Sequence, residues 1–313
     1  MTGPRLRVGV VGVGHLGRHH ARLLAAMPDV ELVAVADIDA ARAAEIAAAQ
    51  QTCAVDGWQA LPSDLDAVTV AVPTEAHMAV ALGLIERGLH VLVEKPLARS
   101  VAEADTLIAA AAARRVHLAV GHTERFNPAV TAARAHLTHP RFIEAHRLGT
   151  FPERSLDIDV VFDLMIHDLD LLLSIVAEPV VGVEAVGVPV LTPRIDIANV
   201  RLRFAGGCIA NLTASRISRD RVRKIRFFQP QSYLSIDYAA QEVEYWTLGA
   251  GPAGTPAITG GKLEVPRDEP LKRELEDFVA AVRDGRAPTV TGDQGRAALA
   301  LAAEIVERME HVG

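Results

Sequence analysis

The feature that most constrains the fold is an apolar run at residues 6–11 that passes into the glycine-rich segment 12–17 and then into an alanine- and leucine-rich stretch. Gly12 allows a tight strand-to-helix turn, Gly14 keeps side-chain atoms away from a ligand, and Gly17 lets the helix pack closely on the strand. The N–H groups that begin such a helix suit phosphates. Because glycines also serve turns that bind nothing, the triplet alone leaves a purely structural turn open.

The acidic residue at the end of the next strand-like run favours a dinucleotide. A second strand-like run, residues 31–36, ends at Asp37, about twenty residues beyond the last glycine, where a carboxylate can hydrogen-bond the adenosine ribose. The same carboxylate repels a 2′-phosphate, which favours NAD over NADP. We therefore predict a Rossmann nucleotide-binding unit in which His15 and Leu16 of the turn also contact the cofactor.

Strand-like and helix-like segments alternate as far as residue 120, which is typical of a parallel sheet with helices on both faces. The predicted strands are 5–11, 31–36, 67–72, 90–94 and 116–120, and the predicted helices are 15–26, 39–50, 75–87 and 100–114. Ser100 is a favourable N-cap for the last helix, and Glu103 completes a capping box. We expect a doubly wound NAD-binding domain over residues 1–120.

The sequence pattern changes after Gly121, where β-rich runs separated by short turns predict an open, mainly antiparallel sheet. The runs are 180–190, 197–204, 208–215, 222–228, 233–237 and 242–246, followed by a predicted loop at 249–261 and helices at 271–284 and 293–311. The expected fold class is therefore α/β, with a Rossmann domain followed by an α+β substrate-binding and oligomerisation domain over residues 121–313.

Composition excludes several classes of protein. With 50% hydrophobic and 23% charged residues, the 313 residues are typical of a globular chain with about two domains. The net charge of −7 argues against general nucleic-acid binding, and no run resembles a signal peptide or a membrane span, so we expect a cytoplasmic protein. Cys53, Cys208 and the scattered histidines show no metal-ligand spacing, which predicts reduced thiols and no metal.

Two segments at the ends of predicted parallel strands carry useful side chains, and such strand ends are where these sheets bind ligands. The first contains Pro73, Thr74 and His77, and the second is Glu94-Lys95-Pro96. The proline holds Lys95 at a non-helical corner, where its ammonium can stabilise negative charge on a substrate oxygen. A solvated loop lysine paired with Glu94 is an equally good explanation of this spacing.

A third segment is a helical pattern that runs from Asp163 to Val176 with one apolar stripe. Asp163 and His167 are four residues apart, so they are neighbours on the polar face. A carboxylate there can orient the imidazole, which can then accept a hydroxyl proton during alcohol oxidation. The alternative is a solvated helix face that carries a histidine by chance.

Together these residues resemble the Gfo/Idh/MocA family, which includes glucose-fructose oxidoreductases, inositol dehydrogenases and rhizopine-catabolism oxidoreductases. The resemblance covers essentially the whole chain and rests on the glycine turn with Asp37, Ala71-Val72-Pro73 with His77, Glu94-Lys95-Pro96, and the Asp163/His167 pair. It implies that Lys95, Asp163 and His167 are catalytic. It also implies that NAD is contacted by residues beyond the turn, namely Pro73, Thr74, His77, Glu94, Lys95 and Arg125.

The chain departs from the family at one place. Members often have glycines before and between the aspartate and the histidine, where this chain has Val160, Val161 and Met165. The substrate pocket should therefore differ from that of a free-sugar or inositol enzyme.

A narrower resemblance points to a branch that oxidises the 3-hydroxyl of UDP-N-acetylglucosamine, before a pyridoxal-phosphate aminotransferase makes the 3-amino sugar of lipid A. It rests on residues 121–128, 163–170, 196–199, 211–216 and 224–230. It implies a homodimer or homotetramer and substrate contacts from Lys95, Arg125, Asn127, Asp163, His167 and Arg216.

The segment 216–226 has six cations and a single acid, which suits a pyrophosphate. A charged strand edge or a subunit contact explains the same composition. Another sugar, a cyclitol or a UDP-hexuronate is the alternative substrate, and a non-catalytic nucleotide-sensing protein is the alternative from another class.

Overall fold

The computed structural model describes residues 4–151, 158–251 and 255–310. The chain forms two compact units, one of residues 1–122 and 271–299 and the other of residues 123–270 and 300–313. The sequence-based division had placed everything beyond residue 120 in the second domain. The contacts group residues 271–299 with the first unit, because helix α7 (Pro270–Asp284) contributes to the core of that unit.

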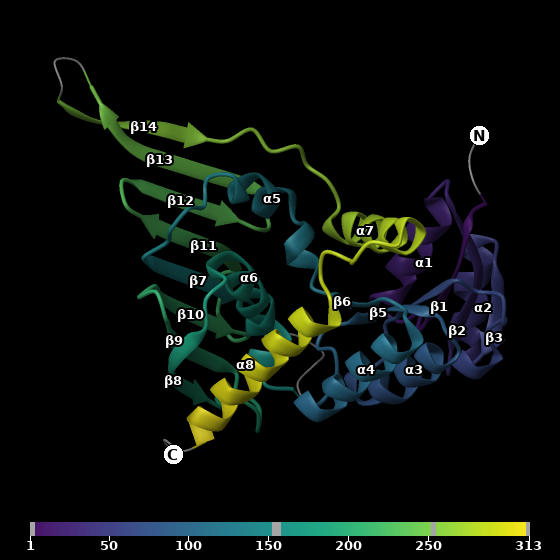
Figure 1. Ribbon diagram of the computed structural model, residues 1–313. Helices are drawn as coiled ribbons and strands as arrows, with labels where there is room; N and C mark the ends of the chain where they lie inside the picture. The colour runs from purple at the N-terminus through teal and green to yellow at the C-terminus, as the bar shows by residue number, and fades with distance from the viewer. Residues whose placement is uncertain (1–3, 152–157, 252–254, 311–313) are drawn as a thin grey trace. The chain divides into compact units, whose positions relative to one another are not determined.

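Six parallel strands form the sheet of the first unit (Figure 1). Their order in the sheet is β3 (Cys53–Asp56), β2 (Val30–Asp37), β1 (Leu6–Val11), β4 (Ala67–Val70), β5 (His90–Glu94) and β6 (Leu118–Gly121). The connecting helices are α1 (Gly17–Ala26), α2 (Ala40–Gln50), α3 (Thr74–Glu86) and α4 (Val101–Arg114), with a short 3-10 turn, η1 (Trp58–Ala60). This order confirms the Rossmann prediction and places a topological switch point between β1 and β4, where such sheets bind ligands. Strand β3 was missed because its residues are mostly exposed and show no apolar run.

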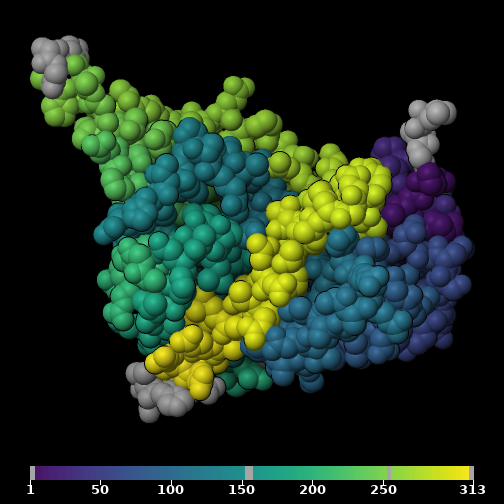
Figure 2. Space-filling model, viewed as in Figure 1, coloured from purple at the N-terminus to yellow at the C-terminus, as the bar shows by residue number. Residues whose placement is uncertain are grey.

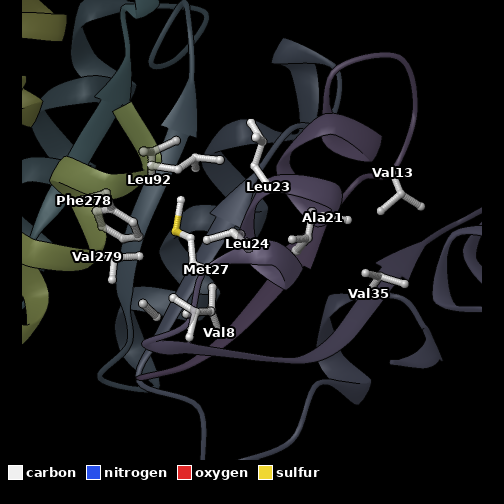
Figure 3. Close-up of a cluster of buried hydrophobic side chains, with 14 of the residues drawn as sticks. Val8, Val13, Ala21, Leu23, Leu24, Met27, Val35, Leu92, Phe278 and Val279 are labelled. Carbon is white, nitrogen blue, oxygen red and sulfur yellow. The ribbon is translucent and has the colours of Figure 1, made fainter. Parts of the chain in front are cut away.

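The core of the first unit lies between strand β1 and helices α1 and α7 (Figure 3). Val8 and Leu24 are fully buried, and Met27, Phe278 and Val279 pack in the same cluster. Each such side chain contributes about 1.5–3 kcal/mol on burial. This packing holds the helix that follows the glycine turn firmly on the sheet.

The predicted cap of α4 is confirmed. The Ser100 hydroxyl accepts a hydrogen bond from the Glu103 N–H at 3.2 Å. The Glu103 carboxylate accepts from the backbone N–H of Arg99 at 3.1 Å, one residue earlier than a capping box requires.

Eight strands form the sheet of the second unit, in which only β7 and β10 are parallel neighbours. Their order is β14 (Pro256–Lys262), β13 (Glu242–Ala250), β12 (Ser232–Asp237), β11 (Val222–Gln229), β7 (Phe142–Leu148), β10 (Ile209–Ser215), β9 (Ile197–Phe204) and β8 (Val180–Val188). The prediction of a mainly antiparallel sheet is confirmed.

Two strands of this sheet were not predicted. Strand β7 mixes charged and apolar residues, so its sequence does not show which of its faces is buried. Alternate residues of β7 are buried because the strand lies between β10 and β11 in the sheet. The loop predicted over residues 249–261 is wrong at both ends. Strand β13 continues to Ala250, and residues 256–262 form β14, which pairs with β13. Gly260 and Gly261 adopt φ of +142° and +154°, which other residues rarely adopt. Residues 252–254 of that loop lie outside the described residues.

The helical elements of the second unit are η2 (Thr123–Phe126), α5 (Pro128–Arg134), the π-helical turn η3 (Val161–Met165), α6 (Ile166–Val176) and the end of α8 (Gly292–Glu310). Helix α5 packs on β12 and β13, and η3 packs on β10. The predicted end of the last helix, residue 311, lies outside the described residues. Within the described part of the chain, no helix combines the length and apolar character needed to cross a membrane.

Candidate active site

The three glycines of the turn serve two different purposes. Gly12 has a φ of +81°, and a Cβ there would lie 2.6 Å from the Ala71 carbonyl oxygen. A Cβ on Gly17 would lie 1.7 Å from the Gly12 carbonyl oxygen, so both positions exclude a side chain. A Cβ on Gly14 would meet no atom within 4 Å. The open space at Gly14, at the start of α1, is where a phosphate group can approach the backbone.

His15 and Leu16 are both exposed beside this space, and Leu16 occupies the N-cap position of α1. No acidic residue lies in the first turn of α1, so the positive end of the helix dipole is not neutralised there. These residues therefore fit a dinucleotide pyrophosphate.

Asp37 ends strand β2 and is 8% exposed. Its carboxylate accepts hydrogen bonds from the Val13 N–H at 2.8 Å and the Asp39 N–H at 2.9 Å, and lies 3.7 Å from the Arg42 guanidinium. A carboxylate has about four acceptor positions. Asp37 therefore holds the glycine turn in place and keeps acceptor capacity for a ligand hydroxyl.

Pro73 and Thr74 lie where strand β4 gives way to α3, and His77 is the fourth residue of that helix. The His77 side chain is buried, with Nδ1 2.8 Å from the Pro96 carbonyl oxygen and Nε2 2.9 Å from the Val72 carbonyl oxygen. Burial lowers the pKa of His77 below its ordinary value. Because both ring nitrogens face backbone carbonyls, the ring supports the sheet edge, and a cofactor contact by His77 stays a prediction.

Lys95 follows β5 directly, and its neighbour Glu94 is buried. One Glu94 oxygen lies 3.0 Å from His20 Nε2, and the other accepts the Lys95 N–H at 3.3 Å. Burial by itself raises the pKa of Glu94, but His20 and Lys95 together hold the pKa below its ordinary value. Glu94 is thus not the solvated ion-pair partner that the sequence left open. It has a structural role at the Lys95 backbone, and its cofactor contact stays a prediction.

In the second unit, the segment that carries Asp163 and His167 is not one regular helix as predicted. Asp163 lies in the π-helical turn η3 and His167 in the first turn of α6. Both are half-buried, whereas most of the predicted apolar stripe, including Met165 and Leu169, is fully buried. Single π turns within helices occur frequently at functional sites.

Buried ion pairs that the sequence did not reveal anchor α6. Arg147 donates to both oxygens of Asp168, at 2.8 and 2.9 Å, and to Glu124 at 3.0 Å. Its guanidinium carbon also lies 5.0 Å from the centre of the Tyr238 ring. Despite burial, the charges of Asp168 and Glu124 raise the pKa of Arg147 well above its ordinary value. Arg147 and Tyr238 carried no local signal, because their partners are distant in sequence.

Arg125, in η2, is 8% exposed and lies 3.7 Å from Asp170 of α6. Asn127 caps α5 by accepting the Ala129 N–H at 3.0 Å. The Asn127 amide also donates to Glu124 and to the Tyr238 carbonyl, each at 3.1 Å. Asn127 therefore has a capping role within the fold, and its substrate contact stays a prediction.

Arg216 is also used within the fold. It is 2% exposed, lies 3.6 Å from Asp196, and donates to the carbonyl oxygens of Ile158 and Ile195. Asp159 accepts the Ile195 N–H at 2.9 Å, so this cluster holds the chain just before η3. Arg216 therefore has an anchoring role in the fold, and its substrate contact stays a prediction.

The rest of the basic segment is partly neutralised by acidic neighbours. Lys224 lies 3.2 Å from Asp237 and Arg226 lies 3.5 Å from Glu144. Among the described residues, no group of three or more histidine, cysteine or acidic side chains is arranged to hold a metal ion.

The switch-point glycine turn, the acid that ends β2 and the lysine that follows β5 define a dinucleotide-dependent oxidoreductase. The chain belongs to the GFO/IDH/MocA oxidoreductase family, described as having an NAD-binding Rossmann fold. The model of the NAD-binding domain matches residues 6–122, and that of the C-terminal domain matches residues 129–229. NAD is the cofactor of this family, and the resemblance seen in the sequence is confirmed.

Two relatives and one solved structure illustrate this membership. The chain is 41% identical over 302 residues to UDP-N-acetylglucosamine 3-dehydrogenase from Acidithiobacillus ferrooxidans, which covers 96% of both proteins. A solved structure of the enzyme of that name from the same organism has a TM-score of 0.93 and 40% identity over 99% of both chains. The chain is also 27% identical to myo-inositol 2-dehydrogenase from Thermotoga maritima, over 95% of this chain and 94% of the relative.

Proposed function

We propose that this protein oxidises the 3-hydroxyl of UDP-N-acetylglucosamine to a ketone with NAD as the oxidant. The observation that carries the proposal is the 41% identity over 96% of the chain to a dehydrogenase of that name. A 3-keto sugar is a substrate for a pyridoxal-phosphate aminotransferase, which would supply the 3-amino sugar of lipid A. The proposed location is the cytoplasm, where NAD and nucleotide sugars occur together.

Each candidate residue has a proposed chemical role. Bound NAD supplies a hydride acceptor at C4 of the nicotinamide. His167 takes the hydroxyl proton while the C3–H electron pair leaves as hydride and the C=O bond forms. Asp163 orients His167, and the Lys95 ammonium stabilises the negative charge that develops on the oxygen. Arg125 is proposed to contact the substrate or the nicotinamide ribose.

The alternative is a dehydrogenase for another sugar, a UDP-hexuronate or a cyclitol. The specific observation in its favour is the 27% identity to a myo-inositol 2-dehydrogenase. The basic segment no longer argues strongly for a pyrophosphate, because Arg216, Lys224 and Arg226 have acidic neighbours in the fold.

The test is NADH formation, measured by absorbance, with NAD and UDP-N-acetylglucosamine. An aminotransferase with its amino donor is added because oxidation of an alcohol by NAD has an unfavourable equilibrium. We expect NADH with the nucleotide sugar and none with free N-acetylglucosamine or myo-inositol.

NADH with myo-inositol alone would establish the alternative. The absence of NADH with every sugar, together with tight NAD binding, would favour a nucleotide-sensing protein. A single-turnover assay separates that outcome from an enzyme whose product release is slow.

We also propose a homodimer or homotetramer. In support, the β13–β14 hairpin, light green in Figure 2, exposes Trp246, Leu248 and Ile258, which are 38%, 47% and 74% exposed. Apolar side chains gathered on a surface mark interaction sites. Light scattering during size-exclusion chromatography tests this, since a monomer mass at micromolar concentration would contradict it.

A further inference from the structure

Two buried histidines of the first unit flank the segment Glu94-Lys95-Pro96, here called the lysine corner. His20 is the fourth residue of α1, and His77 is the fourth residue of α3. Both side chains are almost completely buried. Neither is a catalytic residue under the proposed function, so the reason for placing two titratable rings here is a separate question.

His20 reaches the corner through Glu94. The Nε2 atom of His20 lies 3.0 Å from one oxygen of the buried carboxylate, whose other oxygen accepts the Lys95 N–H at 3.3 Å. The sheet makes room for this carboxylate, because a Cβ on Gly121 would lie 3.0 Å from it. A hydrogen bond to an ionised group is stronger than a neutral one, and burial strengthens it further.

His77 reaches the other side of the corner. Its Nδ1 atom lies 2.8 Å from the Pro96 carbonyl oxygen, and its Nε2 atom lies 2.9 Å from the Val72 carbonyl oxygen. Val72 follows β4 and Pro96 follows β5, so this ring lies between the carboxyl ends of two neighbouring strands, and in its neutral form it donates to one of the two carbonyl oxygens. The backbone is thereby held both before and after Lys95.

A lysine side chain is flexible, with a four-carbon stem that sets no position by itself. The position of its ammonium therefore depends on how firmly its Cα is held. A misplacement of about 1 Å at a reacting centre can cost about 100-fold in rate. The chain uses lysine at only four positions, Lys95, Lys224, Lys262 and Lys272, which allows Lys95 to be observed individually.

We propose that His20 and His77 are positioning residues for Lys95, His20 acting through the Glu94 carboxylate and His77 through the Pro96 carbonyl. The proposal rests on the catalytic role of Lys95 under the proposed function. Because His20 belongs to the helix that begins at Gly17, it also links the nucleotide-binding turn to the lysine corner.

The test compares matched amide variants. His20→Gln places an amide donor near the former Nε2 position, whereas His20→Leu removes it. His77→Asn keeps a donor near the former Nδ1 position, toward Pro96, whereas His77→Gln keeps only the donor toward Val72. His90→Gln is the control, because His90 begins β5 and its Nδ1 accepts the His117 N–H at 2.9 Å, at the opposite end of the strand.

We expect His20→Leu and His77→Gln to lower kcat by about 10-fold to 100-fold. The KM for NAD should change little, and His20→Gln and His77→Asn should recover most of the rate. His90→Gln should keep the wild-type kcat even where its Tm falls. If His20→Leu does not fold, the double variant H20L/E94Q is compared in its place, because E94Q removes the buried negative charge of Glu94 that His20→Leu leaves uncompensated.

A second readout needs no turnover. Reductive methylation with ¹³C-formaldehyde labels the lysines, and the Lys95 signal is identified by its loss in Lys95→Arg. We expect the shift and titration of that signal to change in His20→Leu and His77→Gln but not in His90→Gln. An unchanged Lys95 signal and unchanged kcat in the folded variants would overturn the proposal.

The two proposals fail differently. If Lys95→Met keeps the wild-type kcat, the catalytic role of the lysine is wrong, whatever the histidine variants do. If Lys95→Met loses turnover while His20→Leu and His77→Gln keep it, only the positioning proposal is wrong.

Discussion

The Asp37 carboxylate accepts the Val13 N–H at 2.8 Å, so the residue expected to recognise the cofactor ribose also holds the glycine turn. Recognition of the cofactor ribose and the geometry of the glycine turn therefore both depend on the Asp37 side chain. Arg42 lies 3.7 Å from the same carboxylate and 3.0 Å from Asp39, beside the region that a 2′-phosphate would enter.

Asp37→Ala should relax the preference for NAD over NADP, because it removes the repulsion of a 2′-phosphate and releases Arg42 to bind one. The KM values for the two cofactors measure this change. A modest fall in Tm should accompany it, since the Val13 N–H loses its acceptor. Asp39→Ala, the control, should keep the NAD preference; an equal shift in the control would contradict the role of Asp37.

Gly14→Ala should fold normally yet weaken NAD binding by about tenfold, or about 1.4 kcal/mol, because its Cβ meets only open space in the protein. Gly17→Ala should instead be destabilised or fail to fold, since its Cβ would lie 1.7 Å from the Gly12 carbonyl oxygen. Calorimetric NAD titration and thermal unfolding separate the two effects. Unchanged NAD affinity in Gly14→Ala would argue against phosphate binding at this turn.

Lys95→Met and His167→Asn should lower turnover by about 100-fold or more, while NAD binding stays nearly intact. The reason is that, under the proposed function, both groups act on the substrate oxygen and its proton. Lys272→Met, on α7, is the matched control and should keep full turnover. Loss of NAD affinity with unchanged turnover would contradict the assignment.

Asp196 should contribute stability that disappears in acid. Burial alone raises its pKa, but hydrogen bonds from the Leu191, Thr192 and Val190 N–H groups and the Thr192 hydroxyl hold the pKa at about 2. Because the folded pKa lies below the unfolded value, the contribution is present above about pH 4 and is lost as pH falls toward 2. At about 1.4 kcal/mol per pKa unit, it amounts to roughly 2 kcal/mol.

Asp196→Asn should therefore be less stable than the wild type at pH 7, with the difference shrinking in acid. Urea unfolding at pH 7 and at pH 3 measures this. A difference that is independent of pH would show that the carboxylate charge is not responsible.

Arg147→Met should destabilise the second unit by about 3–5 kcal/mol, because Asp168 would remain buried without its partner. Arg226→Met is the control, since its pair with Glu144, at 3.5 Å, is partly exposed and should contribute at most about 1 kcal/mol. Denaturant unfolding compares the two. Equal effects would contradict the importance of burial at Arg147.

Local patterns in the sequence were sufficient for much of the fold. The alternation of strands and helices to residue 120 and the Ser100 cap depend on neighbours within a few residues, so they could be predicted. Strand β7 could not, because its partners β10 and β11 lie tens of residues away. Strand β14 pairs with the neighbouring strand β13, but its own residues carry no clean alternation of apolar and polar side chains.

The same distinction holds for the candidate site. The sequence by itself determined the glycine turn, Asp37 and the identity of the residues that follow β4 and β5. Only the tertiary structure decided that His77, Glu94, Asn127 and Arg216 bond within the fold. Their partners are brought to them by folding, and a buried polar group must be satisfied wherever the fold places it.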